Sequence, residues 1–393
     1  MTWSHGAKNG TPTGRYPRPV VTLCVLLLLA CCTGTPARTT PTPATGGTTG
    51  LQVRDNRLVD GAGRTVRLTG FNHSGAEYAC VEGWGVFDAP ADPAAVTAAM
   101  ASWSGANAVR LPLNEQCWLG LGTDPRYSGD AYRAAIAKMV DELSAKGFAV
   151  ILDLHRSAPG AARSLNQETM PDRDHSIDFW RSVASAFANR SNVVFDVFNE
   201  PAPYSGESSA RAWKCWRDGG CVLRSTNGGG DFVAAGMTEL VAAIRAAGAR
   251  NVVLVGGIRW AEQLDDWLTY RPDDPAHNLA ASFHDYSFNT VCASRDCYDT
   301  VLARLVAHVP LVVGEIGPDL TLSAQDADRN CPPSAVHGTR FVTEAFDWMD
   351  AHGVSYTAWS WNRWPSCWAL ISDWSGTPTP IWGEFVHDHL RGH

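Results

Sequence analysis

The chain has 393 residues, long enough for one large domain or two ordinary ones. With 45% hydrophobic and 18% charged residues it can build a sizeable core, which excludes a globally disordered protein. The formal net charge is −8 and no basic stripe offsets it, so a nucleic-acid partner is not expected.

The first 30 residues are typical of an export signal. Three basic residues precede the apolar run Val20 to Ala30, which is too short to cross a bilayer as a helix of about 20 residues. The run ends in the letters LLAC, which resemble a bacterial lipobox that makes Cys31 the lipidated first residue of the mature protein. Simple secretion and a retained membrane helix are the alternatives. Residues 31–50, rich in Thr, Pro and Gly, predict an extended tether.

The cysteines also favour an exported protein. Eight of the eleven lie after the tether: Cys80, Cys117, Cys215, Cys221, Cys292, Cys297, Cys331 and Cys367. None forms a Cys-x-x-Cys pair, so disulfides are expected and a zinc site is not. The segments 215–221 and 292–297 suit local bridges. Pairing Cys80 with Cys117 and Cys331 with Cys367 would complete the set, although about a hundred pairings of eight cysteines are formally possible.

From residue 66 onward, short apolar runs alternate with longer amphipathic stretches. Eight runs are predicted strands: Val66–Asn72, Ala108–Leu113, Phe148–His155, Asn192–Glu200, Asn251–Gly257, Leu279–Tyr286, Pro310–Ile316 and Ser355–Asn362. Their apolar, partly β-branched composition is typical of strands buried on both faces of a parallel sheet.

The segments between these runs predict helices, for example over 130–146, 176–189 and 231–247. Eight such repeats indicate an α/β fold of the (β/α)₈ barrel type, forming a single domain over 51–393. An open doubly wound sheet is the alternative, but no glycine-rich phosphate-binding pattern follows the first strand. Residues 51–65 predict a small hairpin that closes the barrel floor.

Polar or aromatic residues end seven of the eight predicted strands. They are Asn72, Arg110, His155, Asn199, Glu200, His284, Tyr286, Glu315 and Trp361. Because the carboxyl ends of barrel strands converge on one mouth, we expect these side chains to meet there and form the site.

Glu200 and Glu315 are the candidate catalytic pair. Both follow apolar runs, which should place them in a low-dielectric mouth. Two facing carboxyl groups with separated pKa values are what retaining glycoside hydrolysis requires. Arg110 could keep one of them ionised. The alternative is that both acids merely begin helices and interact with the helix dipole.

Five segments, in this order, resemble those of glycoside hydrolase family 5, the cellulase-like retaining β-glycosidases, over essentially all of residues 51–393. They are Ala108-Val109-Arg110-Leu111-Pro112, Asp153-Leu154-His155, Asn199-Glu200-Pro201, His284-Asp285-Tyr286 and Gly314-Glu315. Asn-Glu-Pro alone is a weak motif, whereas the ordered set is specific.

The resemblance implies a role for each site residue. Glu200 would be the acid/base and Glu315 the nucleophile. Asn199 would bind the sugar 2-hydroxyl, Arg110 and Tyr286 would hold Glu315, and His155 and His284 would line the same subsite. Trp361 would be the platform under the sugar ring, preferred over Trp359 because it lies further along the strand.

We therefore expect an extracellular or cell-surface enzyme, lipid-anchored through Cys31, with endo-β-1,4-glucanase as its activity. Action on mannan, β-1,3-glucan or a furanose-containing glycan is the alternative within the family, and a non-catalytic glycan-binding protein is the alternative outside it. The expected partner is a polysaccharide or oligosaccharide, with no cofactor, no metal and no nucleic acid. Membrane contact is expected only through the lipid, and the chain is expected to be a monomer.

Overall fold

A computed structural model of the chain describes residues 47–318, 339–364 and 366–392. All of them belong to one compact unit that extends from Ala44 to His393. The expected signal segment 1–30, the lipidation residue Cys31 and most of the tether 31–50 lie outside the described residues.

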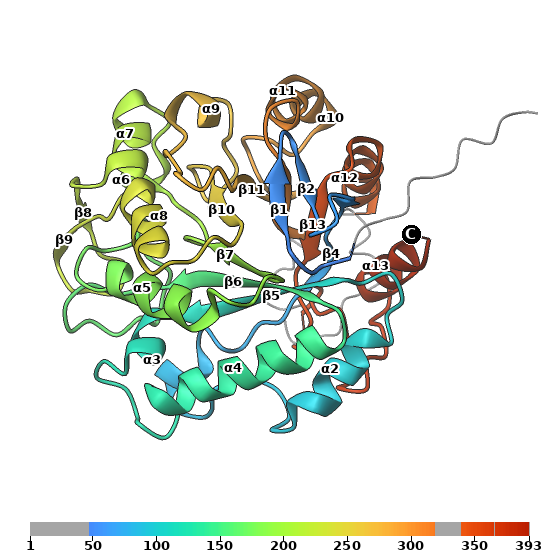
Figure 1. Ribbon diagram of the computed structural model, residues 1–393, viewed down its shortest axis with the longest axis horizontal. Helices are drawn as coiled ribbons and strands as arrows, with labels where there is room; N and C mark the ends of the chain where they lie inside the picture. The colour runs from blue at the N-terminus through green and yellow to red at the C-terminus, as the bar shows by residue number, and fades with distance from the viewer. Residues whose placement is uncertain (1–46, 319–338, 365, 393) are drawn as a thin grey trace, which may run out of the picture. The chain divides into compact units, whose positions relative to one another are not determined.

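Eight parallel strands form a closed barrel, in which β7 pairs with β10 and β13 pairs with β4 (Figure 1). The strands are β4 (Thr69–Asn72), β5 (Ala108–Asn114), β6 (Ala149–Arg156), β7 (Val193–Asp196), β10 (Val253–Gly256), β11 (Leu279–Tyr286), β12 (Leu311–Gly317) and β13 (Ser355–Ala358). The predicted (β/α)₈ barrel is confirmed and the open sheet is excluded, because a closed ring has no edge strands.

Apolar side chains from alternate strand positions fill the inside of the barrel. Ala108, Ile151, Leu254 and Val312 belong to one buried cluster, and residues from the N-terminal segment such as Leu58 pack against them. This segment forms a three-stranded antiparallel sheet of β1 (Gln52–Arg54), β2 (Arg57–Val59) and β3 (Thr65–Val66), one strand more than the expected hairpin. The sheet covers the amino end of the barrel and leaves the carboxyl end for the site.

Helices surround the barrel strands (Figure 1). The described helices are α1 (Ala79–Glu82), α2 (Pro93–Ala101), α3 (Glu115–Leu119), α4 (Asp130–Ala145), α5 (Ser176–Phe187), α6 (Pro203–Gly206), α7 (Ala210–Asp218), α8 (Met237–Ala246), α9 (Trp267–Tyr270), α10 (Arg295–Cys297), the π-helix η1 (Tyr298–Leu302), α11 (Ala303–Val306), α12 (Thr339–His352) and α13 (Trp382–Arg391).

The predicted helix over 231–247 is wrong in its first part. Asp231–Val233 forms β9, which pairs antiparallel with β8 (Val222–Arg224), and helix α8 begins only at Met237. Only the central residue of Asp231–Val233 is buried, which is the two-residue alternation of a strand. The prediction extended the helical pattern of α8 backwards over this short strand.

Three disulfides join Cys80 to Cys117, Cys215 to Cys221, and Cys292 to Cys297. These are three of the expected pairings. Cys331, the expected partner of Cys367, lies outside the described residues, so that bridge remains a prediction. The bridge from Cys80 ties helix α1 to helix α3.

Two β-bulges lie near the carboxyl ends of the barrel strands. In β6, Leu154 pairs with Leu113 but Arg156 pairs with Asn114, so His155 is the extra residue. In β12, Val313 pairs with Phe283 but Glu315 pairs with His284, so Gly314 is the extra residue. Because a bulge redirects the side chains beside it, both devices aim polar residues at the barrel mouth.

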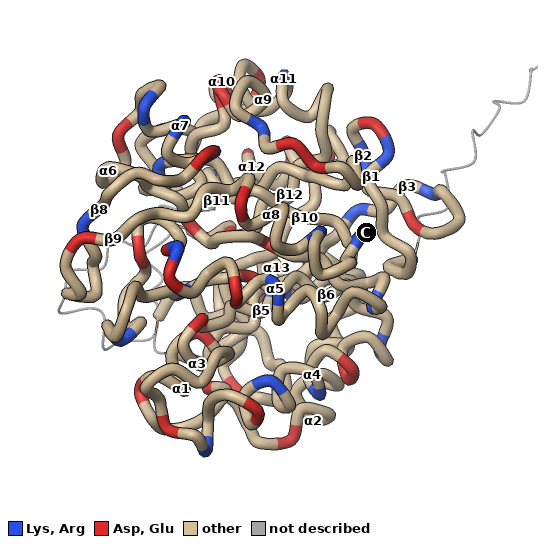
Figure 2. The backbone as a smooth tube through the Cα atoms, turned by 60° about the vertical axis from the view of Figure 1, so that its left-hand side comes forward, with Lys and Arg blue, Asp and Glu red and all other residues tan. Residues whose placement is uncertain are grey.

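Basic and acidic residues are interspersed along the backbone in the view of Figure 2. Several form exposed pairs one helical turn apart, such as Arg295 with Asp299 and Arg340 with Glu344. Such pairs contribute at most about 1 kcal/mol each to stability. In the described part of the chain, no helix combines the length and the apolar character needed to cross a membrane.

Candidate active site

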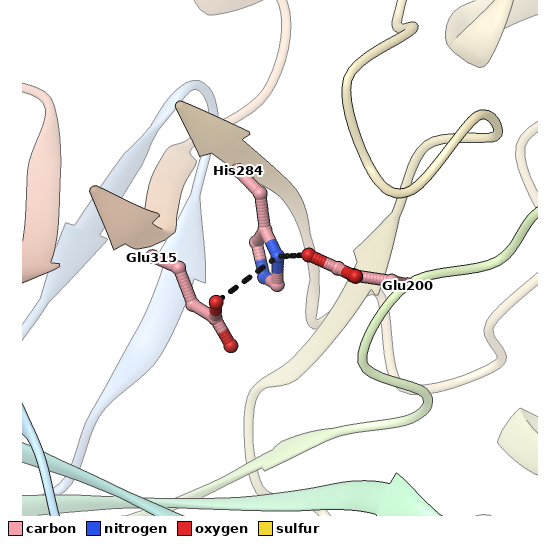
Figure 3. Close-up of side chains that lie close together, drawn as sticks. All are labelled: Glu200, His284 and Glu315. Atoms are coloured by element: carbon pink, nitrogen blue, oxygen red, sulfur yellow. Dashed lines mark hydrogen bonds and ion pairs between the residues drawn. The ribbon is translucent and has the colours of Figure 1, made fainter. Parts of the chain in front are cut away.

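Glu200 and Glu315 lie on either side of His284 at the carboxyl end of the barrel (Figure 3). Glu200 follows β7, Glu315 lies in β12, and His284 lies in β11 between them. Nδ1 of His284 is 2.9 Å from Oε1 of Glu200 and 3.7 Å from Oε2 of Glu315. One side-chain atom from each of the three residues lies within 4.8 Å of the others. The two carboxyl groups therefore face each other across one imidazole.

Both oxygens of Glu315 accept hydrogen bonds from other barrel strands, one from β5 and one from the adjacent β11. Nη1 of Arg110 donates to Oε1 at 2.9 Å, and the hydroxyl of Tyr286 donates to Oε2 at 2.6 Å. Gly317 makes room for the tyrosine ring, since an added Cβ would lie 2.8 Å from Cε1 of Tyr286. Glu315 is thus held in one orientation by two donors.

Arg110 is completely buried and binds five side chains. The guanidinium contacts the carboxylates of Glu315, Asp196 and Asp153 at 2.9–3.1 Å. It also donates to the side-chain oxygens of Asn72 and Asn199. Burial raises the pKa of Asp153 to about 8 and that of Asp196 to about 7, against the opposing charge of Arg110. One positive charge thus faces three carboxyl groups, and this imbalance favours the protonated form of the two aspartates.

Glu200 has a different environment, and its side chain is 19% exposed. Nε2 of Gln167 donates to Oε2 of Glu200 at 3.0 Å. Burial raises the pKa of Glu200, and the Gln167 hydrogen bond partly opposes this. Burial also lowers the pKa of His284 to about 3, so this imidazole is neutral and does not act as a cation beside Glu200. A raised pKa suits Glu200 to hold a proton for donation.

His155 and Trp359 form a further part of the site. Nδ1 of His155 lies 2.7 Å from Oδ2 of Asp153, so the buried aspartate orients the ring. The rings of His155 and Trp359 stack, with centroids 5.6 Å apart and planes 12° apart. Burial lowers the pKa of His155, which favours its neutral form.

The expectation that Trp361 is a sugar platform is wrong. Trp361 is completely buried, and its ring packs on Phe71 and Trp103 with centroid distances of 4.6 and 5.0 Å. The expectation assumed that strand alternation continues to Trp361. Strand β13 ends at Ala358, so the alternation no longer applies there, and Trp359 is the indole that lies beside His155.

The structure brings the other predicted site residues together around the two carboxyl groups. Glu200, Glu315, Asn199, His155, His284 and Tyr286 lie together at the barrel mouth. Asn72, predicted to bind substrate, is completely buried with Arg110. Its Oδ1 accepts from Arg110 and its Nδ2 donates to the carbonyl oxygen of Gly314, so it braces the guanidinium and the β12 bulge.

Sequence reasoning missed three residues of the site, Asp153, Asp196 and Gln167, and it ranked Trp359 below Trp361. The two aspartates had a signal, because each interrupts an apolar strand and an acid inside a buried strand needs a partner. Gln167 lies in a long loop, and no spacing pattern marked it.

Within the described residues, one group of donors could hold a metal ion, namely Glu200, His284 and Glu315. Both oxygens of Glu315 already accept hydrogen bonds, from Arg110 and Tyr286. A cation at this point would therefore lie beside an existing guanidinium, which is unfavourable. The donor set fits an acid pair better than a metal centre.

A cavity of about 730 Å³ lies at the opposite, amino end of the barrel. The N-terminal sheet contributes Val53 and Asp55 to its lining, and segments that precede β11 and β12 contribute His277 and Val309. It includes none of the residues of the carboxyl pair. Basic, acidic and apolar side chains all line this cavity, so its chemistry does not indicate one class of ligand.

Comparison with known proteins identifies one family. The model of the family described as cellulase (glycosyl hydrolase family 5) matches residues 59–364. Endoglucanase MaCel5A of Microbulbifer sp. (strain ALW1) is 25% identical over 69% of this chain and 46% of its own length. Endoglucanase E-5 of Thermobifida fusca is 22% identical over 87% of this chain and 63% of its own length. A mannan endo-1,4-beta-mannosidase of Streptomyces lividans is 24% identical over 80% of this chain and 66% of its own length.

The chain thus spans between 46% and 66% of the length of these three curated relatives. Among solved structures, β-glucanase SdGluc5_26A from Saccharophagus degradans in complex with cellotetraose aligns with a TM-score of 0.63 at 20% identity, covering 91% of this chain and 99% of that one. The catalytic domain of Thermobifida fusca endoglucanase Cel5A aligns with a TM-score of 0.57 at 20% identity, covering 87% of this chain and 97% of that one. At such identities these structures support the shared fold.

Proposed function

The chain belongs to glycosyl hydrolase family 5, and from this premise we propose that it is a retaining glycosidase, specifically an endo-β-1,4-glucanase. The observation that carries the proposal is the pairing of Glu200 and Glu315, whose side-chain atoms approach within 4.8 Å around His284. Retaining enzymes place their two carboxyl groups about 5–5.5 Å apart, whereas inverting enzymes leave about 6.5–9.5 Å for a water molecule.

The different environments of the two acids give each a role. An oxygen of Glu315, oriented by Arg110 and Tyr286, forms a bond to the anomeric carbon as the glycosidic carbon–oxygen bond breaks. The proton of Glu200 passes to the leaving oxygen, which keeps the bonding electrons. Glu200 then takes a proton from a water molecule whose oxygen attacks the anomeric carbon and releases Glu315.

Other residues bind and orient the sugar in this proposal. Trp359, stacked on His155, offers its flat face to the C–H groups of the sugar ring. Gln167 hydrogen-bonds to both Asn199 and Glu200, so the amide of Asn199 lies near the acid, and we assign it the contact to the sugar 2-hydroxyl, which strengthens in the transition state. His284 keeps the two carboxyl groups apart as a neutral spacer.

The activity and the substrate are tested together with a panel of defined oligosaccharides of β-1,4-glucan, mannan and β-1,3-glucan, with product sizing. We expect internal cleavage of β-1,4-glucan, and Glu315→Gln should lower the rate at least about 10³-fold. Preferred cleavage of mannan or β-1,3-glucan would replace the glucanase assignment. Equal sugar release by the wild type and Glu315→Gln would reject the assignment of the nucleophile.

We also propose that the protein acts at the cell surface, anchored by a lipid on Cys31. The support is the sequence that precedes this residue, since residues 1–46 are outside the described part. Cys31→Ser should move the protein from the membrane fraction to the medium, and unchanged fractionation would remove the lipid proposal. The segment bounds 1–30, 31–50 and 51–393 and the monomeric state likewise remain predictions.

A further inference from the structure

Gln167, in the loop between β6 and α5, contacts two consecutive residues of the site through one amide. Its Nε2 donates to Oε2 of Glu200 at 3.0 Å and lies 3.3 Å from the backbone oxygen of the same residue. Its Oε1 accepts from Nδ2 of Asn199 at 3.2 Å. The amide therefore lies directly against the carboxyl group that is proposed to give and take the proton.

The donors of Arg110 determine which way these amides face. A guanidinium can only donate, so Oδ1 of Asn199 must face Nη2 of Arg110, at 2.9 Å. Nδ2 of Asn199 must then face Gln167, whose oxygen accepts and whose Nε2 is left to face Glu200. The orientation of each group follows from hydrogen-bonding capacity, which is how amide orientations are assigned.

We propose that Gln167 is a positioning residue that completes a hydrogen-bonded chain between the two carboxyl groups of the site. The chain runs through Glu315, Arg110, Asn199, Gln167 and Glu200. This inference rests on the proposed function. Because its Nε2 only donates, Gln167 stabilises the charged form of Glu200, which forms when the proton passes to the leaving oxygen.

The loop that carries Gln167 is clamped to the turn between β8 and β9. The hydroxyl of Thr226 donates to the backbone oxygen of Gln167 at 2.7 Å. The next residue, Glu168, accepts from the backbone N–H of Thr226 at 3.0 Å and from Nδ2 of Asn227 at 2.9 Å. Gln167 is therefore held in place by contacts outside the site, as a preorganised positioning residue requires.

The direct test is the titration of Glu200 by carbon-13 NMR of its carboxyl group, assigned by its loss in Glu200→Gln. Gln167→Met, which keeps the side-chain length, should raise the pKa of Glu200 by about one unit, because a hydrogen bond to the charged form is lost. Gln167→Glu should raise it further through like-charge repulsion. The matched control is Asn166→Ala, an exposed neighbour in the same loop, which should leave it unchanged. If the pKa of Glu200 in Gln167→Met equals that in the wild type, the proposal is overturned.

Kinetics supply a readout that a merely structural role would not move. In Gln167→Met the basic limb of kcat/KM should shift to higher pH by about one unit. At the pH optimum, kcat for an oligosaccharide should fall about tenfold, whereas an aryl glycoside with a good leaving group, which needs little protonation, should change less than about twofold. Equal losses on both substrates with an unshifted limb would overturn the proposal. If the wild type hydrolyses no glycan, the proposed function is rejected. The titration of Glu200 would still show whether Gln167 stabilises its charged form.

Discussion

At the scale of single residues, the site shows how burial decides role. Arg110 and Asn72 are completely buried, so they orient Glu315 and the β12 backbone from below. Glu200 retains some exposure, which an acid that meets substrate needs. The sequence identified these residue types because each ends a buried strand. It could not assign depth, since depth depends on side chains contributed by other strands.

The two tryptophans after β13 give a residue-scale prediction. Trp359→Ala should lower kcat/KM about tenfold or more, because it removes a face on which the sugar stacks. It should also lower the free energy of unfolding, because the Trp359 ring is largely buried against His155 and Trp364. Trp361→Phe should leave kcat/KM within about threefold while lowering the free energy of unfolding by about 1–3 kcal/mol, because it leaves a gap against Phe71 and Trp103. Steady-state kinetics and denaturant unfolding separate the two effects. A larger activity loss in Trp361→Phe than in Trp359→Ala would contradict the assignment of the platform.

At the scale of elements, bulges and glycines in the strands create the site. Gly314 is the extra residue of the β12 bulge, and an added Cβ there would lie 3.1 Å from Nε2 of His284. His155 is the extra residue of the β6 bulge. Apolar runs and turn residues were enough to predict the strands. Bulges left no comparable signal, because they depend on the register between two strands. The hairpin of β8 and β9 was missed for a similar reason, since its pairing is not visible in a helical periodicity.

Gly317 at the end of β12 gives an element-scale prediction. Gly317→Ala places a methyl group 2.8 Å from the Tyr286 ring and should displace its hydroxyl from Glu315. The loss of a hydrogen bond to a charged group predicts a fall in kcat/KM of about 10- to 100-fold. In Tyr286→Phe, kcat/KM should fall by a similar factor. Gly61→Ala is the control, because a Cβ at Gly61 approaches no atom closer than 3.6 Å. Wild-type kinetics in Gly317→Ala would show that this glycine does not position Tyr286.

At the scale of the whole molecule, the barrel buries several acids whose pKa values are raised. Burial raises the pKa of Asp285 and of Asp153 to about 8. Their folded forms retain protons that the unfolded chain releases near pH 4, so their contribution to stability is largest at low pH and is lost as pH rises towards 8. Burial lowers the pKa of His284 to about 3 and of His73 to about 4, which acts in the opposite direction but only below about pH 6.5.

Between about pH 6.5 and 8 the acids therefore dominate, and stability should fall with rising pH. Each group with a pKa near 8 contributes about 1.4 kcal/mol per pH unit in this window. Asp285→Asn should remove one such contribution and flatten the slope, while Tyr298 keeps a partner at the position of the Asp285 carboxyl group. Unfolding free energies measured from pH 6 to 8.5 test this. The same slope in the wild type and Asp285→Asn would show that Asp285 is ionised in the folded protein.

The barrel was predictable as a whole because eight apolar runs with polar ends repeat along the chain. The N-terminal sheet was predicted only approximately, since a single hairpin was expected over residues 51–65 and the structure has three strands there, the third of only two residues. The contacts of Gln167 could not be predicted, because they join a loop, a hairpin turn and two strands that are distant in sequence.

The central claim is that Glu315 attacks the anomeric carbon while Glu200 handles the proton. It is tested most directly by trapping the intermediate with a 2-deoxy-2-fluoro glycoside of the preferred sugar, followed by mass spectrometry of the digested peptides. The account predicts one sugar attached to Glu315, and no label in Glu315→Gln. A label on another residue, or turnover with inverted anomeric configuration and no labelled peptide, would contradict it.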